Sequence, residues 1–396
     1  MSRSQTVPLI YKATGWAIDA MDAMFKSQIL VEGQENLVDK PTLFVVNHFT
    51  RIETFILPHA IYRHTKKQVH SLADAHLFGG KIGDYLHSLG AFSTRDQFRN
   101  RRIISELMTG EYNWVIFPEG LMVKNKQIYE RGRLWMSNPE RTGPPHTGAA
   151  VLALKAELIK RRYLDAVRVE DKDTMGYYEK RYNFNGSNDL SFKEIVVIPV
   201  NITYYPIRSG KNLLSQVAQT LIHKLPERIE EELEVEGNIL FSETDISIYF
   251  GAAINVFEYI DQYLPLVKTF LPFMSDRKQD NLIIWRQKSS LTQRFMQEIY
   301  TKVAINYEHL FCASLRYLSK NTIDIQDFNR ALYLTASEIW NLNGRRTHQT
   351  LSEQLIRTLC DEEHEPQSKI EGKAVNEKIL RIENGAYFVD RSSFSL

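Results

Sequence analysis

The sequence predicts an α/β protein in which a mixed sheet is flanked by helices and a mainly helical C-terminal region follows. Two observations support this prediction. Over roughly the first 258 residues, short apolar runs typical of buried strands alternate with helical patterns. Beyond that point the strand patterns stop, and apolar residues recur at every fourth position, which indicates helices.

The chain begins with a predicted amphipathic helix over residues 1–30. An apolar stripe with spacings of three and four runs through residues 8–28, with Trp16 nearby. Its members are Ile10, Ala13, Ala17, Met21, Met24 and Phe25. Such a stripe either packs on the protein core or lies on a membrane surface. The pattern favours the core and leaves the membrane surface open.

Three apolar runs predict buried strands, at residues 43–46, 113–117 and 195–200. Each is followed by polar or turn-forming residues. Helical patterns lie between the runs, at residues 100–108 and 148–159. Because strands and helices alternate, we expect the polar chemistry at the strand ends.

Two further segments complete the predicted organisation. Residues 160–193 are rich in charged side chains and predict a polar insertion in the region 31–258, outside its core. The mainly helical region is expected over residues 259–396, with a small winged end near residues 378–389. Its helical repeats are Leu291, Phe295, Ile299 and Val303, and then Leu351, Leu355 and Leu359.

Composition excludes several classes of protein. Lys and Arg (49) balance Asp and Glu (48), whereas a general nucleic-acid binder needs a strongly basic face. The two cysteines, Cys312 and Cys360, show no metal-ligand spacing, so we expect no metal site and a reducing, cytoplasmic compartment. No secretory signal is expected at the N-terminus. A spanning helix needs roughly 20 apolar residues, so no membrane-crossing segment is expected.

The first candidate site is Asn47-His48, at the end of a predicted strand, with Glu53 five residues beyond the histidine. Histidine accepts a proton near neutral pH, and a carboxylate bonded to its other nitrogen fixes its tautomer. A strand-to-helix turn allows the two side chains to meet. Taken alone, this spacing is common, and a structural histidine is the better interpretation.

Two further motifs carry side chains suited to binding a substrate. Gly90, Phe92 and Arg95 form a turn with an arginine that can grip phosphate through two hydrogen bonds. Arg99, Arg101 and Arg102 come next and are better explained as a solvated helix face. The other motif is Phe117-Pro118-Glu119-Gly120, where a strand ends in a carboxylate and a glycine.

In this order and spacing, these motifs resemble the glycerolipid acyltransferase superfamily, which includes the lysophosphatidate and glycerol-3-phosphate acyltransferases. His48 and Glu53 match its His-x4-Asp box, and Phe117 to Gly120 match its Phe-Pro-Glu-Gly box. Gly90, Phe92 and Arg95 match the box between them, and Pro199 and the His-Thr-Gly-Ala-Ala run at 146–150 match later segments. The resemblance implies a glycerol-3-phosphate acyltransferase-like layer and an acyltransferase domain over residues 31–258.

Two positions depart from the family pattern. Glu53 stands where aspartate is usual, and Leu121-Met122 replaces a small hydroxyl residue and an arginine. The second change removes a phosphate-binding residue. Its candidate replacements are the basic side chains of Lys124, Arg131 and Arg133.

The resemblance also implies a mechanism. His48, oriented by Glu53, takes the proton of an acceptor hydroxyl that attacks an acyl thioester. The implied substrate-binding residues are Asn47, Gly90, Phe92, Arg95, Glu119 and Gly120. Acyl-CoA or acyl-acyl carrier protein is the expected co-substrate, and no other cofactor is expected. The expected acceptor is glycerol-3-phosphate or a lysophospholipid such as lysophosphatidate, at the inner face of a membrane to which the protein is peripheral.

Other classes of function are less favoured by the sequence. No Gly-x-Ser-x-Gly elbow and no glycine-rich nucleotide loop is present, which disfavours a serine hydrolase or a nucleotide-binding enzyme. The altered Phe-Pro-Glu-Gly box, which is the third box in chain order after those of His48 and Gly90, leaves open a non-catalytic lipid-binding or scaffolding protein. A regulator with a helix-turn-helix near residues 323–359 is less favoured, because that region lacks a basic helix.

Overall fold

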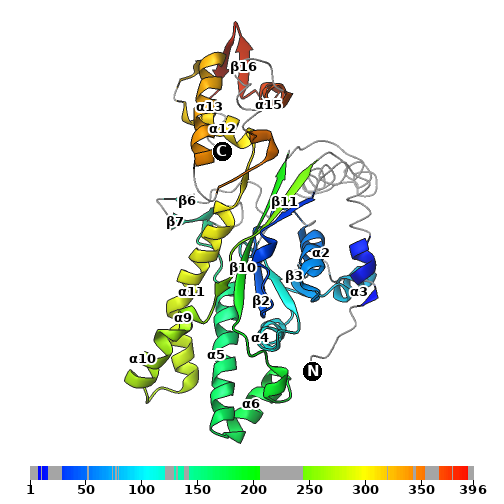
Figure 1. Ribbon diagram of the computed structural model, residues 1–396, viewed down its shortest axis with the longest axis vertical. Coiled ribbons are helices and arrows are strands. Elements are labelled where there is room, and N and C mark those ends of the chain that lie inside the picture. Colours follow the sequence, from blue (N-terminus) through cyan, green and yellow to red (C-terminus); the bar gives the residue numbers. More distant parts are fainter. Residues whose placement is uncertain are drawn as a thin grey trace. The chain divides into compact units, whose positions relative to one another are not determined.

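The computed structural model describes residues 8–9, 11–16, 29–50, 53–73, 75, 78, 80–120, 129–130, 133–137, 142–205, 244–318, 320–341, 345–352, 365–376 and 378–390 (Figure 1). The chain divides into two compact units, Met1–Tyr300 and Thr301–Leu396. The unit boundary therefore lies later than the predicted one near residue 258. The difference arises because helix α11 (Asp276–Thr301) packs its apolar side chains into the main core of the first unit.

Within the described residues, the first unit is built on a mixed sheet of eight strands, as predicted. Its strand order is β1-β11-β10-β2-β5-β3-β4, and β12 also pairs with β10. The five strands from β10 to β4 are parallel, whereas β11 is antiparallel to β10. The strands are β1 (Ile29–Glu32), β2 (Thr42–Val46), β3 (Val69–Ala73), β4 (Ala91–Ser93), β5 (Asn113–Ile116), β10 (Val196–Tyr205), β11 (Asp245–Phe250) and β12 (Ile254–Asn255).

Strand β2 is buried on both faces, as expected for a central parallel strand. Leu43 and Val45 point into one core cluster, and Phe44 and Val46 point into the other. The first cluster is covered by α4 (Arg99–Thr109), α5 (Gly148–Arg168) and α11, and the second by α2 (Glu53–Thr65) (Figure 1). The predicted strands and helices at these positions are confirmed.

The predicted polar insertion at residues 160–193 is wrong. Helix α5 continues to Arg168 and is followed by α6 (Lys172–Tyr182). Between the charged residues, Tyr163, Tyr182 and Phe184 are buried in the main core. The charged side chains conceal this contribution, because the apolar residues are widely spaced along the sequence.

The second unit is mainly helical and has its own core, centred on Phe311, Phe328 and Tyr387. Its helices are α12 (Tyr307–Tyr317), α13 (Ile325–Asn341) and α15 (Glu365–Asn376). They accompany an antiparallel sheet of β14 (Thr322–Asp324), β17 (Ala386–Val389) and β16 (Leu380–Glu383). The hairpin of β16 and β17 occupies the predicted winged end. Leu355 and Leu359 of the predicted repeat lie outside the described residues.

Short elements complete the described chain. They are α3 (Gly80–Ser88), α9 (Glu258–Asp261), α10 (Tyr263–Phe270), β6 (Tyr129–Glu130), β7 (Arg133–Leu134), β8 (Met136–Ser137), β9 (Thr142–Gly143), β13 (Ala304–Ile305), β15 (Arg346–Thr347) and the short 3-10 turns Gln34–Asn36, Ser187–Asp189 and Gln349–Leu351. Among the described residues, no helix combines the length and the apolar character needed to cross a bilayer.

The N-terminal segment is helical at residues 11–16 and packs on α2. Tyr11 is buried, donates a hydrogen bond to the Pro58 carbonyl (3.3 Å) and meets the Tyr62 ring edge-on. Core packing is therefore confirmed for these residues, although Tyr11 and Gly15 face inward rather than the predicted Ala13. The stripe residues Ile10, Ala17, Met21, Met24 and Phe25 lie outside the described residues.

Candidate active site

His48 and Glu53 meet in the turn between β2 and α2, as the sequence predicts. The Nδ1 atom of His48 lies 2.8 Å from Oε2 of Glu53. Glu53 is fully buried, whereas 16% of the His48 side chain is exposed. Because the carboxylate engages Nδ1, the tautomer with its proton on Nδ1 is favoured, and Nε2 is left to accept a proton.

The turn itself holds the Glu53 carboxylate in place. The backbone N–H of Phe49 lies 2.9 Å from Oε1, and that of Thr50 lies 3.1 Å from the same oxygen. From β10, the Tyr204 hydroxyl donates to Oε1 as well (3.2 Å). Several hydrogen-bond donors thus converge on this buried carboxylate. Glu53 is therefore fixed where it can orient the histidine.

Glu119 lies beside this pair because β5 is the parallel neighbour of β2 and both strands end at the same edge of the sheet. Its side chain is buried, and Oε2 accepts a hydrogen bond from the backbone N–H of His48 (3.3 Å). Glu119 of the third box therefore holds the backbone of the first box at His48. The phenyl ring of Phe117 stacks on the imidazole of His48, with 4.2 Å between ring centroids.

Tyr300, which sequence reasoning missed, completes this cluster from α11. Its hydroxyl donates to Oε1 of Glu119, so the carboxylate bridges the tyrosine and the His48 backbone. Burial raises the pKa of Tyr300, and the nearby charge of Glu119 raises it further. The hydroxyl therefore stays protonated and remains a donor. No local pattern could reveal a contact between residues so distant in the sequence.

Gly120 is required by a close approach of His146. Its φ is +76°, and a Cβ atom there would lie 2.9 Å from the His146 ring. The backbone N–H of His146 bonds to the Pro118 carbonyl (3.2 Å). The predicted later segment at 146–150 is therefore brought against the third box.

The residues of the second box lie at opposite ends of β4: Arg95 follows the strand, at the same edge of the sheet as His48 but farther along it, whereas Gly90 precedes the strand. Gly90 has a φ of +82°, and a Cβ atom there would lie 2.7 Å from the His70 ring. Phe92 is buried against His70 and lies under the guanidinium of Arg102 (4.2 Å to the ring centroid). Arg95 is exposed just after β4. Three strand spacings separate β4 from β2, which is about 14 Å between strand axes.

Asn47 is buried, and both ends of its amide are bonded to one residue of β10. Its Oδ1 accepts from the Ile202 N–H (2.8 Å), and its Nδ2 donates to the Ile202 carbonyl (2.9 Å). These contacts tie the end of β2 to β10. They are the contacts of a residue that shapes the turn.

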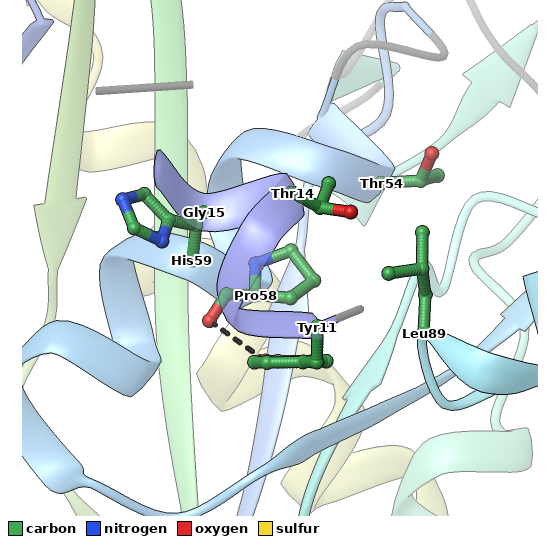
Figure 2. Close-up of a pocket in the computed structure, with 7 residues that line it drawn as sticks. All are labelled: Tyr11, Thr14, Gly15, Thr54, Pro58, His59 and Leu89. Carbon is green, nitrogen blue, oxygen red and sulfur yellow. Dashed lines mark hydrogen bonds between the residues drawn. The ribbon is translucent and has the colours of Figure 1, made fainter. Parts of the chain in front are cut away.

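A small cavity lies between the N-terminal helix and α2 (Figure 2). Its volume is about 30 Å³, which suits about one water molecule and is too small for an acyl chain. Its walls are Tyr11, Thr14, Gly15, Thr54, Pro58, His59 and Leu89. We therefore regard this cavity as part of the packing of the N-terminal helix.

The candidate replacements for the missing arginine are not placed by the structure. Lys124 and Arg131, together with Leu121 and Met122, lie outside the described residues, as does the side chain of Arg133.

Of the comparisons with known proteins, the family model covers this site. Residues 28–202 match the model of the Acyltransferase family, and this stretch contains His48, Glu53 and Glu119. This part of the chain belongs to that family, which confirms the assignment to the glycerolipid acyltransferase superfamily. A search of curated proteins finds no match.

The solved structures that are similar to the chain include an acyltransferase from a bacterium. It is described as the 1-acyl-sn-glycerophosphate (LPA) acyltransferase, PlsC, from Thermotoga maritima. The match has 14% sequence identity and a TM-score of 0.36, and it covers 74% of this chain and 81% of that chain. Similarity at that level is not evidence for a substrate.

Proposed function

We propose that the protein is an O-acyltransferase that moves a fatty acyl group from an acyl thioester to the hydroxyl of glycerol-3-phosphate or a lysophospholipid such as lysophosphatidate. The observation that carries this proposal is the His48–Glu53 pair at the edge of an acyltransferase-family sheet, braced by Glu119. Unlike the more deeply buried His70, which also bonds a glutamate, His48 is partly exposed at the sheet edge, and this exposure favours a catalytic role over a non-catalytic one.

The proposed reaction needs no acyl-enzyme. Nε2 of His48 takes the proton of the acceptor hydroxyl while the hydroxyl oxygen attacks the thioester carbonyl carbon. Glu53 stabilises the imidazolium that forms. The tetrahedral intermediate then collapses, the carbon–sulfur bond breaks, and the thiolate leaves with the proton that His48 returns. The products are an ester and a free thiol.

We further propose acyl-CoA or acyl-acyl carrier protein as the donor and phospholipid synthesis as the setting. The lipid character of the products supports a cytoplasmic protein that is peripheral on the inner face of a membrane. The direct test uses the purified full chain with each labelled donor against glycerol-3-phosphate and lysophosphatidate. Transfer in any combination supports the proposal, and no transfer in all of them contradicts it.

Arg95 is the proposed ligand of the acceptor phosphate. Arg95→Ala is expected to lower kcat/KM for a phosphate-bearing acceptor by roughly 10- to 150-fold, since a charged hydrogen-bonded contact contributes about 1.5–3 kcal/mol. Arg95→Lys should recover little, because an ammonium cannot reproduce the planar fork. Arg101→Ala, on the exposed face of α4, is the matched control. Equal losses in the two alanine variants would contradict a specific role for Arg95.

Tyr300 is proposed as a positioning residue that acts through Glu119. Tyr300→Phe is expected to lower kcat by roughly 10- to 150-fold and to leave the donor KM unchanged, because a lost hydrogen bond to a carboxylate costs about 1.5–3 kcal/mol. Tyr387→Phe is the matched control, since Tyr387 is a buried tyrosine that donates to Glu371 in the second unit. Steady-state kinetics of both variants test this role. An unchanged kcat in Tyr300→Phe would show that the contact is only structural.

A further inference from the structure

The segment that connects α10 to α11 exposes an unusual amount of aromatic surface. On α10, Leu266 and Phe270 are four residues apart and share one side of the helix, and Phe270 is 71% exposed. Phe273, in the turn that follows, is 81% exposed. On α11, Leu282 and Trp285 are three residues apart, and Trp285 is 68% exposed. We call these five side chains the aromatic tip.

The aromatic tip belongs to a packed part of the fold and is not a frayed helix end. Val267, Ile283 and Ile284, on the same two helices, are buried in the main core. The turn between the helices is held by Gln279, whose amide donates to the Leu271 carbonyl (3.0 Å) and the Met274 carbonyl (3.2 Å). Figure 1 shows α10 lying beside the start of α11.

A buried arginine of α5 anchors the same segment. Arg162 forms ion pairs with Asp276 (2.9 Å) and Asp280 (3.0 Å) and also donates to Gln279 (2.9 Å). Phe270 and Phe273 are thus exposed on a rigid support, and their exposure carries a hydrophobic cost that a binding partner would remove.

The charge of the segment indicates what kind of partner covers it. Residues 262–288 contain five basic and two acidic residues, a net charge of +3, whereas the whole chain is nearly neutral. The two acidic residues are Asp276 and Asp280, which pair with Arg162. Counting Arg162 and Asp165, the ion-pair partner of Lys268, adds one charge of each sign and leaves the net charge at +3. The basic residues are Lys268, Arg277, Lys278, Arg286 and Lys288.

We propose that the aromatic tip docks the protein on the surface of an anionic lipid bilayer. Phenyl, indole and leucyl groups enter the boundary between headgroups and acyl chains, while neighbouring lysines and arginines contact anionic headgroups. The inference rests on the proposed function in one respect, that the product of the reaction is a membrane lipid. It assigns the attachment to a surface different from the N-terminal helix that the sequence suggested.

Co-sedimentation of the full chain with vesicles tests the proposal. The vesicles contain either phosphatidylcholine alone or equal parts of phosphatidylglycerol and phosphatidylcholine. The wild-type protein is expected to bind the anionic vesicles more tightly, and less so at high salt. Phe270→Ser with Phe273→Ser should weaken binding about ten-fold for each phenyl group removed from the bilayer. Arg277→Gln with Lys278→Gln should weaken binding to anionic vesicles only.

The matched control is Leu9→Ser with Trp16→Ser, which removes two exposed apolar side chains from the N-terminal helix. This control is expected to bind like the wild type, and thermal unfolding shows whether each variant is folded. Failure of the wild-type protein to bind anionic vesicles would overturn the proposal. So would wild-type binding by the folded phenylalanine double variant, or a larger loss in the control than in that variant.

Two further measurements separate this proposal from its alternatives. Light scattering that shows a dimer lost in the phenylalanine variant would assign the aromatic tip to a second copy of the chain instead. Transfer to soluble glycerol-3-phosphate should be the same in the wild type and the phenylalanine variant. Vesicle binding without any transfer activity would contradict the proposed function and leave the docking surface standing.

Discussion

His48→Ala is expected to lower the rate of acyl transfer by roughly 100- to 10,000-fold, the usual contribution of a general base. The imidazole is the group that the buried Glu53 orients, at 2.8 Å from Nδ1. Because the His48 side chain is partly exposed at the sheet edge, its removal leaves no large cavity, and the fold should persist. The measurement is single-turnover transfer from a labelled thioester, with circular dichroism as the check on folding.

His70→Ala is the control for this experiment. His70 also bonds a glutamate, with Nδ1 2.6 Å from Oε2 of Glu106, but it is buried among aromatic rings within β3. This variant should lower the unfolding temperature more than His48→Ala does and should affect the folded enzyme's turnover less. Turnover in His48→Ala at the wild-type rate would eliminate His48 as the base.

Glu53→Gln is expected to reduce transfer by a similar factor, roughly 100- to 10,000-fold, although the side chain keeps its shape. The glutamine oxygen can still accept from the Phe49 and Thr50 N–H groups, which leaves the amide NH2 facing Nδ1 of His48. That arrangement makes Nδ1 an acceptor and moves the ring proton to Nε2. A histidine in this tautomer cannot take the proton of the acceptor hydroxyl.

Glu53→Asp separates charge from geometry. It keeps the carboxylate that the family usually carries at this position, and it shortens the reach by one methylene. We expect it to retain much more activity than Glu53→Gln, measured at the same donor concentration. If the glutamine variant were as active as the aspartate variant, the charge of Glu53 would have no part in catalysis.

Local spacing explains which parts of the site could be predicted. His48 and Glu53 are five residues apart, so one turn can join them, and the motif identifies both. Glu119 follows a recognisable strand, and parallel neighbours bring their ends together. Tyr204 and Tyr300 reach the same carboxylates from β10 and α11, and neither lies in a motif. Such contacts depend on how distant elements pack, which one sequence does not reveal.

The fold likewise has parts that local sequence patterns predict and parts that depend on packing between distant elements. Buried parallel strands such as β2 and β10 contain continuous apolar runs, which predict β2 to within one residue and the first half of β10. Helix α6 was missed because most of its residues are polar and Tyr182 alone is buried. The unit boundary was placed too early because the repeat of Leu291, Phe295 and Ile299 indicates a helix and not the core into which it packs.

The contact between Tyr300 and Glu119 has a consequence for dissecting this protein. The family match ends at residue 202, within β10, yet β11 joins β10 to β1, and Tyr300 follows still later. A fragment cut at residue 202 would lack β11, the partner strand of β1, and would lack Tyr300, which bonds Glu119. The smallest piece that keeps the sheet and the Glu119 contacts intact extends to residue 300, which is also where the first compact unit ends.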